Sequence, residues 1–243
     1  MRVTTASLVV CLFTASCAGT ETTRSASVGF SSNYLGRGVV VHDGPVAQAS
    51  LDAAFASEQG VLTTSIWANM DASSEFDAFG SITELDLIAD WTANAGPMTW
   101  STGAIQYTFP HSGAALTTEL YGSIQAADWP LTPTLTAYWD FVEADGLYAT
   151  LGGSHTLDLA ETWSLTLASS IGWMSSGMTA FNYGLSQDAF SDLYATATLA
   201  WTIDEVIGMN AGVAWASVLD SELRDEVEDA DNATLTFGAT VGF

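Results

Sequence analysis

The last eleven residues of the chain, 233–243, alternate strictly between apolar and small or polar side chains. The apolar positions are Ala233, Leu235, Phe237, Ala239, Val241 and Phe243. Alternation with period 2 predicts a β-strand with one apolar face and one polar face, and about ten residues let a tilted strand cross the hydrocarbon core of a bilayer. An apolar strand left at a sheet edge promotes aggregation, whereas closing the sheet into a barrel removes that edge. The stretch therefore predicts the last strand of a closed β-barrel.

Hydropathy and charge support this prediction. The 243 residues combine a mean hydropathy of +0.25 with a net charge of −24, so many apolar side chains must contact something other than water. The sequence contains no internal apolar run near the roughly 18 residues that a membrane helix needs. A barrel accommodates its apolar residues by alternation, because only every second side chain faces lipid. The composition thus favours a membrane barrel over a helical membrane protein.

Basic residues are scarce. Lysine is absent, and the arginines are Arg2, Arg24, Arg37 and Arg224. Nucleic acid is excluded as a partner, since too few cationic side chains are present to neutralise phosphates. The acidity favours either cations in a pore or solubility in high salt.

Residues 1–18 resemble a secretion signal, with a basic residue, a short apolar stretch and then small residues. The segment suits cleavage after Ala18, and lipoprotein processing at Cys17 is the alternative. Both cysteines of the chain lie in this segment, so cleavage leaves neither a disulfide nor a cysteine site. The predicted organisation is a signal peptide, 1–18, followed by one barrel domain, 19–243.

From residue 26 onward the chain repeats an alternating segment, a tight turn, a second alternating segment and a longer loop. About twelve strands are predicted. Their spans are 26–35, 45–56, 60–71, 82–93, 98–109, 117–127, 132–140, 147–157, 163–173, 190–202, 206–218 and 233–243. Residues 21–24 form a polar leader before them. The predicted fold is all-β, a single antiparallel up-and-down transmembrane barrel with short periplasmic turns, long external loops and both chain ends in the periplasm.

Large aromatic residues lie near both ends of the predicted strands. On the turn side they are Phe55, Trp91, Trp100, Trp163, Trp201 and Phe243; on the loop side they are Trp67, Phe109, Trp139, Trp173 and Trp215. Most share the apolar parity, with aliphatic residues between them. Two aromatic girdles around an aliphatic band are typical of a membrane barrel. A soluble β-sandwich alternates equally well but places large aromatics centrally as often as at strand ends.

Several short motifs occur in a recognisable order. They are residues 32–39 (Ser-Asn-Tyr-Leu-Gly-Arg-Gly-Val), 60–69, 84–86 (Glu-Leu-Asp), 106–110 and 119–122. In order and spacing they resemble the TorF family, a group of porin-type proteins of the Gram-negative outer membrane. Leu62 departs from the tyrosine of that pattern, and Trp91-Thr92 departs from its Gly-Tyr. The resemblance implies an outer-membrane barrel with a pore, and it supplies no substrate and no site residue.

The polar parity of the strands defines a predicted lumen. Its candidate pore-lining residues are Gln48, Asp52, Glu84, Asp86, Asp90, Gln106, Glu119, Gln125, Asp140 and Asp192, with Arg37 at the mouth. Inward acids with little basic compensation enrich cations and repel anions. The alternatives are a hydrogen-bonded plug, closed by side chains or loops, and an acidity that reflects only the composition of the proteome.

Arg37 lies beside Gly38 in the first predicted loop, and its parity allows it to point inward. Glu84 and Glu119 are its candidate partners. An arginine that holds the first loop against the wall is the structural interpretation, and control of ion selectivity is the functional one. A folded Arg37→Ala barrel favours the selectivity role, whereas loss of the folded barrel favours the structural role.

Metal binding and catalysis receive little support. Loop 219–232 contains seven acids, but the spacing of a calcium-binding loop is absent, so a solvated loop is the expectation. Outer-membrane phospholipases use a Ser/His/Asn arrangement. Here His155 and Ser169 share the outward parity, yet the expected register pairs His155 with Leu165, some 13 Å from Ser169. No nucleophile-elbow, zinc or phosphate-loop motif is present. No catalytic, metal or cofactor site is predicted.

The sequence therefore predicts an outer-membrane porin that passes small polar solutes passively and prefers cations. Its expected partners are the bilayer, small solutes or cations, and the barrel-assembly machinery, because the strand that ends at Phe243 resembles the C-terminal signal of outer-membrane barrels. The expected location is the outer membrane of a Gram-negative bacterium, reached through the periplasm. A non-conducting structural or adhesive barrel, an outer-membrane lipase and a soluble β-sandwich lipoprotein are the alternatives.

Overall fold

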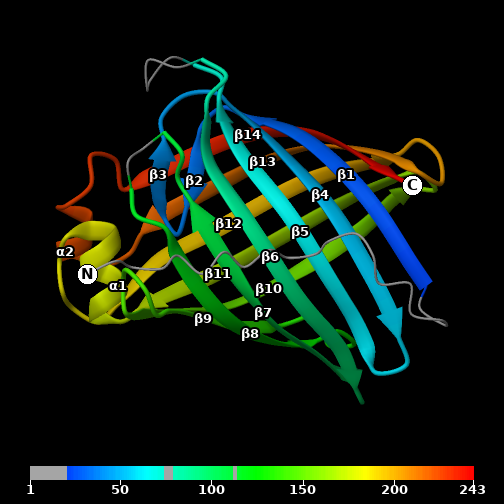
Figure 1. Ribbon diagram of the computed structural model, residues 1–243, viewed down its shortest axis with the longest axis horizontal. Coiled ribbons are helices and arrows are strands. Elements are labelled where there is room, and N and C mark those ends of the chain that lie inside the picture. Colours follow the sequence, from blue (N-terminus) through cyan, green and yellow to red (C-terminus); the bar gives the residue numbers. More distant parts are fainter. Residues whose placement is uncertain (1–20, 74–78, 112–113) are drawn as a thin grey trace, which may run out of the picture.

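The computed structural model describes residues 21–73, 79–111 and 114–243. Within these residues twelve antiparallel strands form a closed barrel (Figure 1), in which each wall strand pairs with the next one along the chain and β1 pairs with β14. The wall strands are β1 (Glu21–Ser31), β4 (Val46–Ser57), β5 (Gly60–Asp71), β6 (Ile82–Ala95), β7 (Met98–Thr108), β8 (Thr117–Ala126), β9 (Thr134–Asp140), β10 (Gly146–Ala160), β11 (Trp163–Met174), β12 (Ala189–Thr202), β13 (Ile207–Val218) and β14 (Asp231–Gly242). The predicted fold class and strand number are confirmed. The predicted signal sequence, with Cys17 and Ala18, lies outside the described residues.

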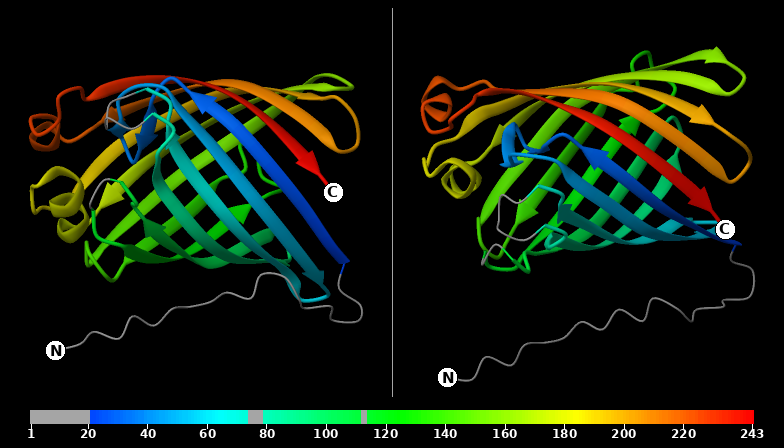
Figure 2. Two further views of the ribbon diagram at one scale, coloured as in Figure 1. Left: turned by 45° about the horizontal axis from the view of Figure 1, so that its top comes forward. Right: turned by 90° about the horizontal axis from the view of Figure 1, so that it is seen from above.

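Short and long connections lie at opposite ends of the barrel, as predicted. The long connections carry the remaining elements: the hairpin of β2 (Tyr34–Gly36) and β3 (Val39–His42), helix α1 (Ser176–Tyr183) and helix α2 (Ser221–Arg224). Figure 2 shows these elements gathered at one end, with the C-terminus toward the other. Neither helix in the described residues is long and apolar enough to cross a membrane. We call the end with the helices the loop end and the other the turn end.

The outer face carries the apolar parity of the strands. The closing pair shows this clearly, because Phe30 of β1 lies opposite Phe237 of β14 and both side chains are more than half exposed. A twelve-residue strand such as β14 is about 40 Å long and, tilted by about 45°, covers about 28 Å, which matches the hydrocarbon core of a bilayer. The exposed apolar surface therefore has the height of a membrane-spanning band.

Aromatic residues flank this band. At the turn end the outward residues include Trp91, Trp100 and the parallel stacked pair Trp163 and Trp201, whose ring centroids are 5.4 Å apart. At the loop end Trp139 and Trp215 face outward. Trp67 is an exception to the predicted girdle. It pairs with Ser50 and Asp86 and therefore shares their inner face.

Two predictions about the strands are wrong. Residues 21–24 are not a leader, because they extend β1 and pair with residues 53–56 of β4. The strand also ends earlier than predicted, at Ser31, and the next residues form the hairpin instead of the wall.

Gln106 is not a lumen residue, since it pairs with Leu87 and Thr118 and shares the outer parity of Trp100. The alternation of β7 runs without a bulge from Trp100 to Gln106, so the two side chains must lie on the same face.

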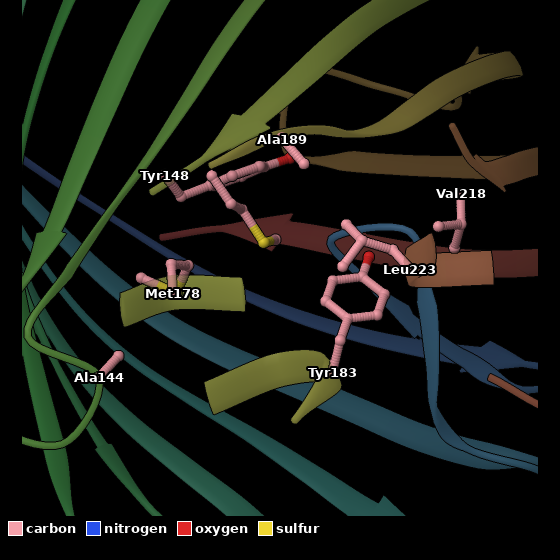
Figure 3. Packing of buried hydrophobic residues seen from close by; sticks show 8 residues of the cluster. Ala144, Tyr148, Met178, Tyr183, Ala189, Val218 and Leu223 are labelled. Carbon is pink, nitrogen blue, oxygen red and sulfur yellow. The ribbon is translucent and has the colours of Figure 1, made fainter. Parts of the chain in front are cut away.

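The buried apolar core lies at the loop end and not in the middle of the barrel. It joins α1 and α2 to the ends of β10 to β13 through Met174, Met178, Tyr183, Val218 and Leu223. Figure 3 shows side chains of this cluster between the two helices and the adjacent strands. Gly146 permits the close approach, because a Cβ atom there would collide with the backbone of Met178. The cluster fixes α1 against the barrel mouth.

Candidate functional site

The hairpin β2–β3, residues 34–42, crosses the barrel at its loop end. It leaves the wall after β1, yet its tip contacts β8, β9 and β10, and β9 is diametrically opposite β1 in the strand order. The tip is a two-residue turn with both residues at positive φ, Arg37 at 49° and Gly38 at 89°, the conformation of a tight hairpin turn that favours glycine. A Cβ atom at Gly38 would lie 2.6 Å from the Cβ of Asp192. The hairpin thus reaches the far wall and narrows the lumen.

Arg37 holds the tip there. Its Nη2 donates to Oε2 of Glu119 at 2.6 Å, and the Tyr107 hydroxyl donates to the same oxygen at 2.9 Å. The guanidinium carbon lies 4.8 Å from the ring centroid of Tyr148 and 5.5 Å from that of Tyr138, both within cation–π range. Burial by itself lowers the pKa of Arg37, but the hydrogen bond and charge of Glu119 raise it above its ordinary value, so the group stays charged. Of the two predicted partners, Glu119 is the one that pairs with Arg37.

Helix α1 supports the hairpin from the loop side. The Tyr183 hydroxyl donates to the main-chain carbonyl of Arg37 at 3.2 Å, and Met178 Sδ lies 3.5 Å from Arg37 Nη1. Burial, and then the charge of Asp192, raise the pKa of Tyr183, so its hydroxyl remains a donor at neutral pH. The hairpin tip, Glu119 and α1 form what we call the constriction.

Asp192 and Asp140 are buried on the inner face, but they serve as acceptors within the wall and loops. Asp192 accepts hydrogen bonds from the hydroxyls of Tyr148 at 3.2 Å and Ser191 at 2.6 Å. Asp140 accepts from Thr117 Oγ1 at 2.6 Å and from main-chain amides of residues 142–144. Asp140 thus fixes the loop after β9.

We expect Asp140→Ala to destabilise the barrel by about 2–4 kcal/mol, because it leaves a buried hydroxyl and loop amides without their charged acceptor. Glu143→Ala is the control, since that exposed side chain lies in the same loop, and surface changes cost less than about 0.5 kcal/mol. Urea unfolding in lipid vesicles, followed by tryptophan fluorescence, measures both. Equal midpoints for the two variants contradict the role of Asp140.

The other predicted lumen acids follow the inner face of the barrel. Glu84 and Asp86 lie on β6 beside the hairpin, and both are buried. Toward the turn end, Asp90 accepts from the Tyr121 hydroxyl at 2.5 Å and Asp52 accepts from Ser50 Oγ at 2.8 Å.

The two inward amides are also bonded within the wall: Gln48 donates to Asn69 Oδ1 at 3.1 Å, and Gln125 donates to Thr134 Oγ1 at 3.1 Å. Apart from Gln106, the predicted strand positions do share one face. The tyrosines that surround Arg37 were not predicted, because nothing local in the sequence indicates which strands the hairpin tip will reach.

The structure also changes the geometry around the histidines. His155 pairs with Leu167 instead of Leu165, because β10 extends to Ala160 and its register shifts between Asp158 and Ala160. This places His155 diagonal to Ser169, which pairs with Gly153, yet the described part of the chain contains no hydrogen bond between the two side chains. The residue that pairs with His155 is therefore two positions from Ser169, and not four as expected.

His42 has an acid and a serine nearby, which the sequence did not predict. Its Nε2 lies 3.4 Å from Asp71 Oδ1 and 3.4 Å from Ser73 Oγ. However, Ser73 Oγ donates to the same Asp71 oxygen at 2.7 Å. In a catalytic triad the histidine lies between the nucleophile and the acid, so this arrangement is a hydrogen-bonded cluster that joins the hairpin to the loop after β5.

The acidic segment 219–232 contains the short helix α2. Asp220 caps the helix by accepting from the amides of Glu222 and Leu223, and Arg224 pairs with Asp231 at 2.6 Å. Among the described residues no group of three or more His, Cys, Asp or Glu is arranged to hold a metal ion.

A known protein family matches most of the chain. The family described as "Bacterial protein of unknown function (Gcw_chp)" matches residues 15–219, which span β1 to β13. The chain belongs to the Gcw_chp family. No curated protein matches this Gcw_chp sequence.

Solved structures share the fold of this Gcw_chp chain at low identity. The COG4313 outer membrane channel from Pseudomonas putida F1 aligns with a TM-score of 0.57 and 10% identity, over 91% of this chain and 95% of that one. The KdgM porin, solved in complex with disordered oligogalacturonate, aligns with a TM-score of 0.53 and 9% identity, over 91% and 99%. The NanC porin aligns with a TM-score of 0.52 and 9% identity, over 90% and 98%. These likenesses show that the chain shares the closed antiparallel β-barrel fold of these proteins.

Proposed function

We propose that the protein is an outer-membrane porin that passes small polar solutes by diffusion and prefers cations. The observation that carries the proposal is the inner face of the closed barrel, where acids outnumber bases. Asp52, Glu84, Asp86 and Asp90 line one side of it, and Arg37 is the basic residue that the described part of the chain directs inward. Such a lumen concentrates cations and repels anions.

The remaining arginines do not offset this charge. Arg24 pairs with Ala53, on the parity of Leu51, and so faces outward near the turn end. Arg224 is paired with Asp231 outside the barrel. An oligogalacturonate, which the KdgM porin binds, carries carboxylates and would be repelled here, so the proposed solutes are neutral or cationic.

Location and assembly belong to the same proposal. An apolar band between two aromatic girdles supports insertion in the outer membrane of a Gram-negative bacterium. The resemblance of residues 32–39 and the later motifs to the TorF family supports the same role. The terminal strand, ending at Phe243, is proposed to bind the barrel-assembly machinery.

A non-conducting structural or adhesive barrel is the second candidate. The constriction favours it, because the hairpin spans the mouth and Met178 of α1 is fully buried behind it. Folded loops can close a barrel of this width.

Current through a planar bilayer with a KCl gradient tests the two candidates. Discrete current steps with a reversal potential that favours K⁺ support the cation-preferring porin. Steps without cation preference support a porin but contradict selection of cations by the acidic lumen. A barrel with heat-modifiable migration in SDS gels that never conducts would falsify the porin and leave the structural or adhesive role.

A further inference from the structure

Asp86 is a buried acid whose side chain is not fully paired. Its exposed fraction is 6%, and its Oδ1 atom is buried without a hydrogen-bond partner. Leaving a buried polar atom unpaired costs roughly 1–3 kcal/mol, and more for a charged group. Asp86 differs in this from five other predicted lumen acids, which accept hydrogen bonds from protein side chains: Asp52, Asp90, Glu119, Asp140 and Asp192.

The charged groups that act on Asp86 are negative, so they do not compensate a negative charge on its carboxylate. They come from two other carboxylates, Glu84 and Glu119. The inward arginine, Arg37, already forms its short ion pair with Glu119. Three neighbouring acids thus share one guanidinium, so a cation from outside the protein would stabilise the ionised form of Asp86.

Aromatic rings frame the carboxylate. Asp86 lies directly between Trp67 of β5 and Tyr107 of β7 in the strand register, so the three side chains are neighbours on the inner face. The ring centroids of Tyr34 and Trp67 are 5.8 Å apart, and Tyr34 also lies beside Glu84. A carboxylate beside tryptophan and tyrosine rings is a favourable environment for an organic ammonium group, because charge pairing and cation–π attraction act together.

We propose that Asp86, with Glu84 and the rings of Trp67 and Tyr107, is a binding subsite for the ammonium group of a small organic amine. The proposal rests on the cation-preferring porin and names its solute class. A bare metal ion fits less well, since these acids do not form a metal-ligating group of three within the described residues. Because Tyr34 contacts Trp67 and lies beside Glu84, the hairpin borders the subsite.

The test is a titration of the refolded full-length barrel, in detergent, with propylammonium chloride at constant ionic strength. Tryptophan fluorescence reports binding, and the Trp67→Phe protein identifies the part of the signal that comes from Trp67. We expect Asp86→Asn to raise the half-saturating concentration about tenfold or more, equivalent to about 1.4 kcal/mol. Glu84→Gln provides a second variant with an expected increase of about threefold, since it removes the neighbouring charge but keeps Asp86.

Asp158→Asn is the matched control. Asp158 lies on the inner face of β10 near the turn end, pairs with Ser164 and is exposed, so its change should leave the titration unaltered. A wild-type barrel that shows no saturable signal from Trp67, or variants that all titrate alike, overturn the subsite.

Conductance of the same preparations separates this proposal from the porin itself. If binding depends on Asp86 but the barrel never conducts, the subsite is supported and the porin proposal is contradicted. Conductance without binding removes the subsite alone.

Discussion

We expect Arg37→Ala to open the proposed channel. We expect its single-channel conductance in KCl to be about threefold that of the wild type or more, because the hairpin tip loses its anchor to Glu119 and to the tyrosine rings and leaves the lumen. Removing one partner of a fully buried ion pair costs about 3–5 kcal/mol. The Arg37 side chain is 23% exposed, so the cost here is smaller, and it falls on hairpin docking. The barrel still folds, since Arg37 lies outside the ladder of wall strands.

Arg37→Lys and Arg24→Ala are the matched variants. Lysine keeps the charge but lacks the planar group that stacks on Tyr148, so we expect a conductance between those of the wild type and Arg37→Ala. Arg24→Ala removes an outward arginine and should not change the conductance. An Arg37→Ala barrel that folds and conducts like the wild type shows that the hairpin lies outside the conducting path, and loss of the folded barrel instead assigns Arg37 a structural role.

Phe237→Arg destabilises the folded barrel by about 2–4 kcal/mol, the cost of placing an arginine at the lipid-facing midplane of a barrel. Phe237 is 62% exposed on the outer face of β14, between the level of Trp215 and the chain end at Phe243. Urea unfolding in vesicles measures the loss of stability.

The neighbouring position provides the control. Thr236 pairs with Ser31 and Gly212 on the inner face, so Thr236→Arg should cost much less stability while it reduces the preference for K⁺ over Cl⁻ in the reversal potential. If the two arginines cost the same stability, the assignment of inner and outer faces in β14 is wrong. If only the Thr236 variant is unstable, the two faces are reversed.

The sequence by itself determined the wall of the barrel. Alternation in residues such as 233–243 fixes which side chains face lipid, and a tight turn such as that at residues 58–59 sets the register of its neighbours, so strand number and most inward residues follow from local pattern. The errors arose where the pattern is locally ambiguous. Polar residues 21–24 resemble a leader until β4 pairs with them, and Gln106 resembles a lumen residue until its register with Leu87 is known.

Only the tertiary structure decided what occupies the lumen inside the wall. The motif around Arg37 predicts an inward arginine, but the contact with Glu119 joins residues 82 positions apart, and its ring contacts lie on strands across the barrel. The lack of a hydrogen-bond partner for Asp86 Oδ1 likewise depends on which groups the hairpin contacts. These outcomes depend on where a fourteen-residue connection between β1 and β4 docks, and a loop of that length has many arrangements of similar entropy, so the choice comes from packing and charge in the closed barrel.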